Sequence, residues 1–364
     1  MGLSEAASSS EAASGEAQAA GPLAVRAALR PIVPGYGPAD EEKSWSELGL
    51  DSFDLLSLRL AVEERAGAEI ADEDWVEAGT PAALARLAAR PAVPAQSGVT
   101  LAESVELGMP QMAVSGLSES WLMKALGDWH WRMTGAALET RPVDIADGAG
   151  NRLFPAFTRI RFVCSAPLAA FEEGERLRID AALSRYGSGI FFSRVAIAGE
   201  KGRTIEAELM SSFARRPGPG GNGRLLGGEP SLPEPCAAPA HAEMPAFGAG
   251  YARRRLAKDA PRPVLARASY AVQPHYDING LGLLYCAAFP MIDDTCRSRA
   301  RKDGAAGTSI VERDICYFAN AGADDDDLEW RLHDEGEDGL ETEASIVRGD
   351  GAVMALVTSR KARL

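Results

Sequence analysis

Hydrophobic residues in the first part of the chain repeat at the three- and four-residue spacing of a helix. After Pro22 this period predicts a first helix, carried by Leu23, Val25, Leu29 and Ile32. A second helix is predicted to open at Asp51-Ser52, and a third, short one covers Asp72 to Glu77. Thr80-Pro81 starts a fourth, because a threonine cap followed by proline suits a first helical turn. The pattern therefore predicts a four-helix bundle over residues 22–90.

Further along the chain, apolar and polar residues alternate as they do in strands with one buried face. Two sets of four such runs are predicted: Phe157 to Val163, Arg176 to Ser184, Phe191 to Ile197 and Thr204 to Phe213, then Ile310 to Phe318, Leu328 to His333, Thr342 to Val347 and Ala352 to Ser359. A helix-period stretch precedes each set, through Leu122, Leu126, Trp129 and Met133 in the first and Leu281, Leu284, Tyr285, Ala288 and Ile292 in the second. Each set therefore predicts antiparallel strands with one long helix.

The two sets are copies of an internal repeat. The first opens with Gly108-Met109-Pro110-Gln111-Met112-Ala113-Val114-Ser115-Gly116-Leu117, and the second with Val272-Gln273-Pro274-His275-Tyr276-Asp277-Ile278-Asn279-Gly280-Leu281. Both place five residues between a proline and Gly-Leu. The predicted fold class is therefore α+β, a four-helix domain followed by a duplicated unit in which antiparallel sheets wrap around long central helices.

Composition sets the domain boundaries. Residues 1–21 contain mostly Ala, Ser, Glu and Gly, so we expect a disordered tail. Residues 91–98 and 217–245 have the Pro- and Gly-bearing composition of a linker and a connecting segment. The predicted organisation is therefore a tail (1–21), a helical domain (22–90), a linker (91–98), a first repeat (99–216), a connecting segment (217–245) and a second repeat (246–364).

The chain carries a formal charge of −14, which argues against nucleic-acid binding, because a basic face is needed to neutralise phosphates. From Asp40 to Glu77 there are thirteen acidic and three basic residues. This concentration favours docking onto basic partner surfaces, although a merely solvated acidic face is the alternative. Neither a signal sequence nor a membrane span is recognised, so we expect a cytoplasmic protein. The five scattered cysteines form no Cys-x-x-Cys pair, so we expect reduced thiols and no metal site.

Ser52 is the clearest candidate for chemistry. A serine at a helix start suits a phosphodiester, because free N–H groups and the positive end of the helix dipole favour negative charge there. A plain capping serine is the alternative. The run Trp45-Ser46-Glu47-Leu48-Gly49-Leu50-Asp51-Ser52-Phe53-Asp54-Leu55-Leu56-Ser57-Leu58 resembles the acyl and peptidyl carrier family. The resemblance implies that Ser52 bears 4'-phosphopantetheine, attached by a phosphopantetheinyl transferase.

In the repeats, the starts of the long helices are the candidate catalytic sites. Their unpaired N–H groups can hold a thioester carbonyl, and Gly116 and Gly280 let the backbone approach closely. Asp277-Ile278-Asn279-Gly280 is similar to the Asp-x-x-Gly segment of hot-dog thioesterases, which implies that Asp277 is nucleophile or base. Asp277 and Asn279 as helix caps are the alternative. His275 is a candidate acid-base group, whereas His130, between two tryptophans, is expected to be a core residue.

A second resemblance covers residues 99–364. Met109 to Met112, Ser115 to Leu122, Gly127-Asp128, His130-Trp131 and Tyr276 to Tyr285 resemble the double hot-dog acyltransferase/decarboxylases of the leinamycin type. It implies a double hot-dog fold and adds Ser115 to the candidate catalytic residues Asp277, Asn279 and His275. The family is associated with a pocket tyrosine, and this chain has Phe154 at the position we align with it. A covalent acyl-tyrosine is not expected there.

These resemblances imply a polyketide biosynthesis protein. It would decarboxylate a malonyl or methylmalonyl thioester of coenzyme A and transfer the short acyl group to its own or a partner's phosphopantetheine. The alternatives are a hot-dog thioesterase or dehydratase acting on carrier-bound intermediates, and an inactive scaffold that docks or dimerises a carrier. The expected partners are acyl-coenzyme A, a polyketide synthase or other biosynthetic enzymes, and a second copy in a homodimer. Two basic clusters, Arg253 to Arg255 and Arg297 to Lys302, suit coenzyme A phosphates or the acidic carrier helix, and surface solubility explains either cluster almost as well.

Overall fold

The computed structural model describes residues 22–66, 70, 75, 78–88, 98–187, 189–216, 225–233, 236–238, 244–301, 307–322 and 327–364. The chain divides into two compact units. The first comprises residues 1–96, 185–188 and 239–257, and the second comprises 97–184, 189–238 and 258–364. The predicted tail (1–21) lies outside the described residues, as do the linker (91–98) except Gly98 and parts of the connecting segment (217–245).

The first unit is helical. Residues 22–29 form a helix, followed by η1 (Pro38–Asp40), α2 (Ser52–Ala66), α4 (Pro81–Leu87) and α6 (Met244–Ala257). Thr80 caps α4 as predicted, since its hydroxyl accepts the Ala83 N–H at 3.3 Å. A core that includes Val25, Leu29, Leu58 and Leu84 holds the helices together. The short helix predicted over residues 72–77 lies outside the described residues, apart from Trp75.

A buried ion pair stiffens α2. Arg59 Nε donates to Glu63 Oε1 at 3.0 Å, and both side chains are less than one-twentieth exposed. The same Glu63 oxygen accepts the Ile70 N–H at 3.0 Å, and Arg59 Nη2 donates to the Ile70 carbonyl at 2.6 Å. The pair therefore ties α2 to the loop that follows it and satisfies the backbone groups of a buried residue.

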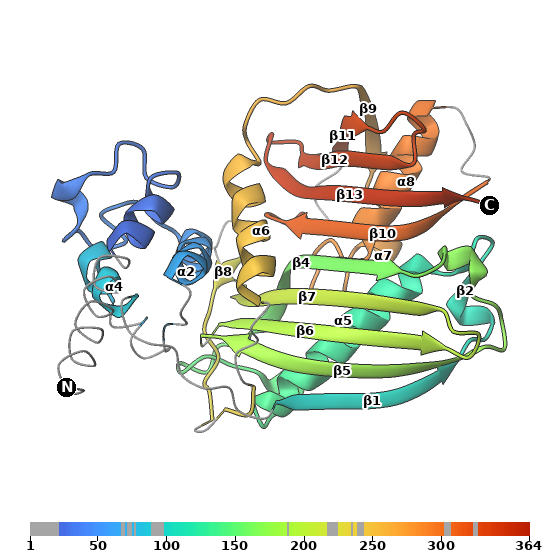
Figure 1. Cartoon of the computed structure of the whole chain (residues 1–364), viewed down its shortest axis with the longest axis horizontal. Helices are drawn as coiled ribbons and strands as arrows, with labels where there is room; N and C mark the ends of the chain where they lie inside the picture. Colours follow the sequence, from blue (N-terminus) through green and yellow to red (C-terminus); the bar gives the residue numbers. More distant parts are fainter. Residues whose placement is uncertain are drawn as a thin grey trace, which may run out of the picture. The chain divides into compact units, whose positions relative to one another are not determined.

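The second unit is built on one large antiparallel sheet (Figure 1). Its long strands are β1 (Val99–Glu106), β4 (Phe154–Cys164), β5 (Arg176–Tyr186), β6 (Ile190–Gly199), β7 (Thr204–Arg215), β9 (Ala266–Ala271), β10 (Thr308–Tyr317), β11 (Asp327–Glu335), β12 (Glu341–Arg348) and β13 (Val353–Arg363). The short strands are β2 (Met112–Ala113), β3 (Gly116–Leu117) and β8 (Leu226–Gly227). The order is β1-β5-β6-β7-β4-β10-β13-β12-β11-β9. Outward from the β4–β10 pair, the first half continues with β7, β6, β5 and β1, and the second with β13, β12, β11 and β9. The strands of the two halves therefore follow one another in the same order, as the internal repeat predicts.

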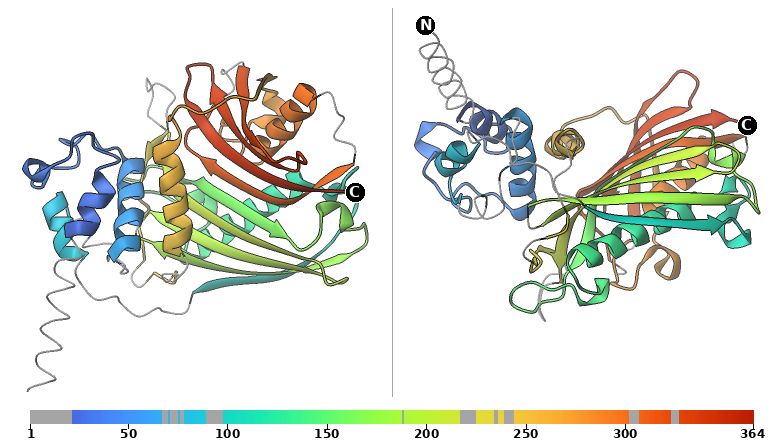
Figure 2. Two further views of the ribbon diagram at one scale, coloured as in Figure 1. Left: turned by 45° about the horizontal axis from the view of Figure 1, so that its top comes forward. Right: turned by 60° about the horizontal axis from the view of Figure 1, so that its bottom comes forward.

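Two long helices lie against one face of this sheet, α5 (Glu119–Ala137) in the first half and α8 (Ala288–Arg301) in the second (Figures 1 and 2). The loops of this unit contain four short helices: η2 (Met109–Gln111), η3 (Pro142–Asp144), η4 (Leu168–Ala170) and α7 (Pro274–Asp277). Along β5, buried and exposed residues alternate, so that Leu177, Ile179 and Leu183 join the core. A single core cluster contains side chains from both halves, including Trp129 and Phe289. Among the described residues, no helix has both the length and the apolar character needed to cross a bilayer.

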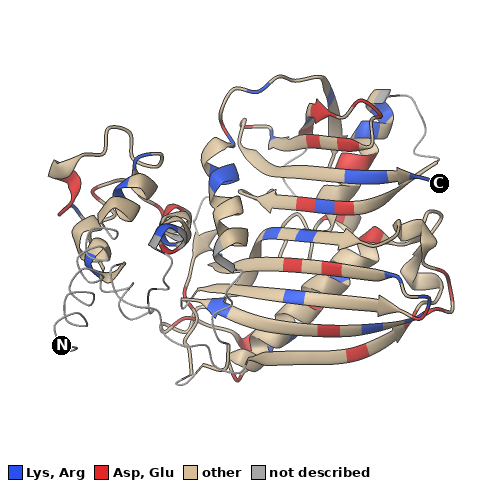
Figure 3. Ribbon diagram, viewed as in Figure 1, with Lys and Arg blue, Asp and Glu red and all other residues tan. Residues whose placement is uncertain are grey.

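Ion pairs support the junction of the two halves. Arg159 on β4 contacts Asp314 on β10 at 2.7 Å, and Arg161 contacts Glu312 at 2.8 Å. Glu312 also accepts from Arg360 on β13 at 3.0 Å. Figure 3 shows basic and acidic positions on the neighbouring strands in the middle of the sheet. Such cross-strand pairs favour this register, because a one-residue slip would turn every side chain to the other face.

The antiparallel strands were predicted correctly, since each of the eight alternating runs overlaps one of β4 to β7 or β10 to β13, with ends that differ by at most four residues. The predicted start of the second long helix was wrong. We expected it at Leu281, but α8 begins at Ala288, because Asn279 to Leu283 form a tight turn. The helix α6 was not predicted, and the boundary expected at residue 246 falls inside it.

Candidate functional site

Ser52 is the first residue of α2. A reciprocal pair of hydrogen bonds shapes this helix start: the Asp54 N–H donates to Asp51 Oδ1 at 2.8 Å, and the Asp51 N–H donates to Asp54 Oδ2 at 3.1 Å. This is a capping box, in which two residues three apart satisfy each other's free backbone donors. The helix start presents Ser52 on a fixed backbone, which fits the covalent attachment of a phosphodiester.

The start of α5 is also capped from within the chain. Ser118 accepts the Trp121 N–H at 3.3 Å, and its own N–H donates to the Gln111 carbonyl at 2.8 Å. Ser115 lies in the exposed turn between β2 and β3. The structure therefore brings the first sequence block to the start of α5, as expected, and leaves Ser115 at the surface.

Gly116 and Gly280, which the repeat aligns, have different surroundings. Gly116 has a φ of +94°, and a Cβ there would lie 2.3 Å from Cα of Ala169 and 2.5 Å from the Leu168 carbonyl oxygen. A side chain at residue 116 would clash with the backbone of η4, so this contact requires glycine. A Cβ on Gly280 would meet no atom within 4 Å, and Gly280 lies in the loop before α8 and not at the helix start.

Asp277 is almost fully buried at the end of α7. Its Oδ2 accepts the Gln273 N–H at 2.7 Å and the Tyr270 hydroxyl at 3.0 Å. Burial and then this bond to the carboxylate raise the pKa of Tyr270 to about 12. These bonds are the ones expected of the structural alternative, in which Asp277 caps α7, and its role as nucleophile or base stays a prediction.

Asn279 shapes the next turn. Its Oδ1 accepts the N–H groups of Leu281 at 2.9 Å and Leu283 at 3.2 Å, which is typical of asparagine in tight turns. His275 is exposed on α7. The loop therefore gathers three of the predicted catalytic residues, Asp277, Asn279 and His275, but the contacts of the first two are with the backbone of the loop itself and with Tyr270.

The N-terminal parts of α5 and α8 converge on Arg313, a fully buried residue of β10. Its Nε donates to Glu119 Oε1 at 2.7 Å, and its Nη1 donates to Asp293 Oδ2 at 2.9 Å. Asp294 Oδ1 lies 3.2 Å from Nη2 and accepts from Lys361 at 2.8 Å. The sequence prediction missed this cluster; its signal is Arg313 at a position where the strand alternation requires a buried residue.

Electrostatics in this cluster are set by burial and by Arg313. Burial raises the pKa of Glu119, and the attraction of Arg313 does not fully offset it. Burial also acts to raise the pKa of Asp294, but Arg313 and Lys361 outweigh it, so the net shift is downward. For Arg313, burial acts to lower the pKa, but Glu119 and Asp294 hold it well above its usual range. The guanidinium is therefore committed to protein carboxylates.

His130 is a core residue, as the sequence predicted. Its Nε2 lies 2.7 Å from Ser211 Oγ, and its Nδ1 is hydrogen-bonded to Ser193 Oγ. Burial lowers the pKa of His130 to about 3, so the ring is neutral at physiological pH. Phe154, where the resemblance places a pocket tyrosine, is buried as the first residue of β4.

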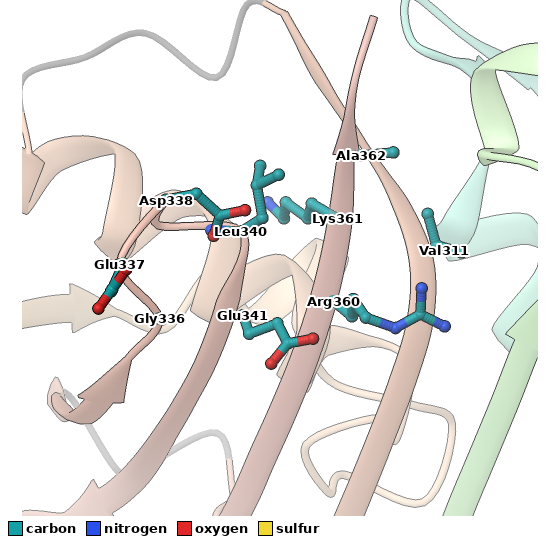
Figure 4. A pocket seen from close by; sticks show the side chains of 9 residues that line it. All are labelled: Val311, Gly336, Glu337, Asp338, Leu340, Glu341, Arg360, Lys361 and Ala362. Carbon is teal, nitrogen blue, oxygen red and sulfur yellow. The ribbon is translucent and has the colours of Figure 1, made fainter.

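A cavity of about 460 Å³ opens beside the far end of β13 (Figure 4). Its walls carry both charges, from Glu337, Asp338, Glu341, Arg360 and Lys361, with Val311, Gly336, Leu340 and Ala362 completing them. Lys361 connects this cavity to the Arg313 cluster through Asp294. None of Asp277, Asn279, His275 and Ser115 lines it.

Residues 33–88 match the family model described as "Phosphopantetheine attachment site". The match includes all of α2, so the first unit contains a phosphopantetheine-attachment domain, as predicted. None of the curated proteins compared with the sequence matches it.

Solved structures resemble close to three quarters of the chain. The 12:0-ACP thioesterase from Umbellularia californica has a TM-score of 0.50 and 10% identity, covering 74% of this chain and 99% of that one. An acyl-ACP thioesterase from Bacteroides thetaiotaomicron has a TM-score of 0.49 and 10% identity, covering 72% and 98%. A protein with a hot dog fold from Alicyclobacillus acidocaldarius has a TM-score of 0.36 and 11% identity, covering 74% and 96%. At these identities the likeness concerns the fold alone, and of these three structures the one from Umbellularia californica reaches a TM-score of 0.50.

Proposed function

We propose that this chain processes thioesters carried on a phosphopantetheine arm attached to Ser52. The observation that carries this proposal is a phosphopantetheine-attachment domain in a chain whose fold resembles that of a 12:0-ACP thioesterase. When attached, the arm supplies the thiol that accepts the acyl group. The four-helix carrier and the double hot-dog body, residues 99–216 and 246–364, are parts of the same proposal.

The proposed reaction is decarboxylation of a malonyl or methylmalonyl thioester of coenzyme A, with transfer of the short acyl group to the arm in a polyketide pathway; the enolate takes a proton from water, and the thiol of the arm then replaces coenzyme A, which leaves as its thiol. Loss of carbon dioxide leaves an enolate, so the site must hold a negative oxygen with N–H donors. The amides of Glu119 and Ser120 in the first turn of α5 are the candidates, because the first turn of a helix has donors without partners in the helix and the Ser118 side chain accepts only the Trp121 N–H of this turn. Neither a metal nor a general base is required for that step.

The contacts of Asp277 suit a positioning role. Its Oδ2 accepts from Gln273 and Tyr270, which holds the carboxylate against the backbone of the loop. We therefore assign Asp277 and Asn279 as positioning residues, which hold the loop of residues 277–285 in place. Arg313 is also a positioning residue, since it fixes the N-terminal parts of α5 and α8.

Thioester hydrolysis is the second candidate, because the solved structure with a TM-score of 0.50 is described as an acyl-ACP thioesterase. In that case His275 or the free oxygen of Asp277 would act on water. A non-catalytic carrier scaffold is the third candidate, and the buried Phe154 in place of a tyrosine supports it.

One experiment separates the three. The protein is converted to its phosphopantetheine form and incubated with carboxyl-labelled malonyl- or methylmalonyl-coenzyme A, while labelled carbon dioxide and intact mass are followed. We expect release of label and an acetyl or propionyl mass gain that Ser52→Ala abolishes. Hydrolysis of an acyl-loaded carrier without label release would identify a thioesterase, and an unchanged protein and substrate would identify a scaffold.

A further inference from the structure

Helix α6 packs along α2 within the first unit, although the two are far apart in sequence (Figure 2). The approach is close: a Cβ on Gly248 would lie 2.7 Å from a methyl carbon of the fully buried Leu60. Phe247 and Tyr251 of α6 are also buried. A glycine at a helix crossing lets two backbones come together, and the burial of Phe247 and Tyr251 shows that α6 is packed on both sides of Gly248.

The same helix, α6, also forms ion pairs with the start of α2. Arg255 Nη2 lies 3.4 Å from Asp51 Oδ1 and 3.5 Å from Asp54 Oδ1. Its side chain is only 10% exposed. Gly248 meets Leu60 and Arg255 meets Asp51 and Asp54, so α2 and α6 run antiparallel over roughly two turns.

The position of this ion pair matters because Asp51 and Asp54 flank Ser52. The first unit is strongly acidic around α2, and electrostatic complementarity attracts basic partner surfaces to such a helix. Arg255, next to Arg253 and Arg254 at the end of α6, offers that complementarity from within the chain. Helix α6 thus makes ion pairs with the acidic start of α2. These are the ion pairs that the basic surface of an external enzyme would make.

We propose that α6 is an internal docking partner of the carrier helix, which competes with any basic enzyme surface that must reach Ser52. The phosphopantetheinyl transferase is the first such enzyme. The competition argument rests on attachment at Ser52, whereas the docking of α6 does not depend on it or on the reaction of the sheet. Release of α6 therefore frees the charges of Asp51 and Asp54 to pair with partners in trans.

The test uses the full-length protein and a charge reversal with a matched control. Arg255→Glu removes the ion pairs and adds repulsion, whereas Arg253→Glu makes the same charge change on an exposed side chain of the same helix. Hydrogen exchange of the α6 amides reports docking, because a helix of this length is marginal unless it is packed. We expect Arg255→Glu to accelerate α6 exchange about fivefold and Arg253→Glu to leave it unchanged. The paired swap Asp54→Arg with Arg255→Asp should restore slow exchange.

Competition is measured on the same variants as the rate of phosphopantetheine transfer by a transferase and coenzyme A, followed by intact mass. The Arg255→Glu variant should be modified about fivefold faster than the parent and Arg253→Glu at the parental rate. Equal α6 exchange in the parent and Arg255→Glu would overturn the docking, and so would equal acceleration by both variants. Faster exchange with an unchanged transfer rate would overturn the competition. If no variant is modified, attachment at Ser52 is refuted while the exchange result still decides the docking.

Discussion

Arg313 and Glu119, which are 194 residues apart in the sequence, form a two-point ion pair, with Nε to Oε1 at 2.7 Å and Nη2 to Oε2 at 2.9 Å. The pair connects the first residue of α5 in one half of the sheet unit to strand β10 in the other. Because Asp293 of α8 binds the same guanidinium, one buried cation holds together the helices that the internal repeat supplies twice.

Replacement of Arg313 by methionine should therefore destabilise the protein severely. It leaves Glu119 and Asp293 buried without a counter-charge, and such a loss costs about 3–5 kcal/mol of unfolding free energy. Urea denaturation followed by tryptophan fluorescence measures this. Arg141→Met, which removes an exposed pair with Asp144, should leave the unfolding curve unchanged, and an equal effect of the two variants would contradict the structural role of Arg313.

The buried His130 predicts a pH dependence of stability. Its folded pKa of about 3 lies below the ordinary value of 6.5, so the unfolded state binds the proton more readily. The stabilisation is complete above pH 6.5 and is lost progressively as the pH falls from there toward 3, by about 2 kcal/mol between pH 6.5 and 5. Unfolding free energies of the parent and His130→Gln over this range test it. The variant should lack that part of the slope, and His275→Gln, at an exposed site, should retain it.

The positioning role of Asp277 predicts a split between two substitutions. Asp277→Asn keeps an oxygen that can accept from Gln273 and Tyr270, so turnover should stay within about threefold of the parent. Asp277→Ala removes the cap and should cost about 1–2 kcal/mol of stability and about tenfold in turnover. Steady-state rates and thermal unfolding measure both. A folded Asp277→Asn protein that is as inactive as the alanine variant would make the charged carboxylate part of the chemistry.

The two glycines of the repeat should respond differently to the same change. Gly116→Ala introduces a methyl group against Ala169 at a positive φ, and we expect a loss of about 3 kcal/mol in unfolding free energy. At Gly280 there is open space, so alanine should be tolerated. Chemical denaturation of both variants measures the difference, and similar losses would mean that the η4 contact is not what requires glycine.

Much of the fold could be predicted from local sequence, because alternation directly encodes a sheet with one buried face. In β5, for example, Leu177, Ile179, Ala181 and Leu183 are buried, and the residues that alternate with them, Arg178, Asp180 and Ala182, are exposed. The start of α8 could not be read in this way. Leu281, Leu284 and Tyr285 have helical spacing, but the Asn279 side chain binds the amides of Leu281 and Leu283 and forms a turn instead.

The parts that escaped prediction depend on contacts between distant residues. Helix α6 has two glycines and little amphipathic pattern, and packing against Leu60 accounts for it better than local preference. The partners of Arg313 come from three separate elements, so no local pattern shows that its charge is neutralised. The sequence did identify the segments around Ser52 and Asp277, but it could not tell a capping carboxylate from a reactive one, because both occur at helix ends.

The central claim is that Ser52 carries the arm on which the sheet unit places an acyl group. The most direct measurement is tandem mass spectrometry of the peptide containing Ser52, after the phosphopantetheine form of the protein has been incubated with methylmalonyl-coenzyme A. We expect phosphopantetheine on Ser52 to bear a propionyl group, in an amount proportional to the carbon dioxide released. A Ser52 peptide that stays unmodified, or an arm that remains a free thiol while the coenzyme A ester is consumed, would contradict it.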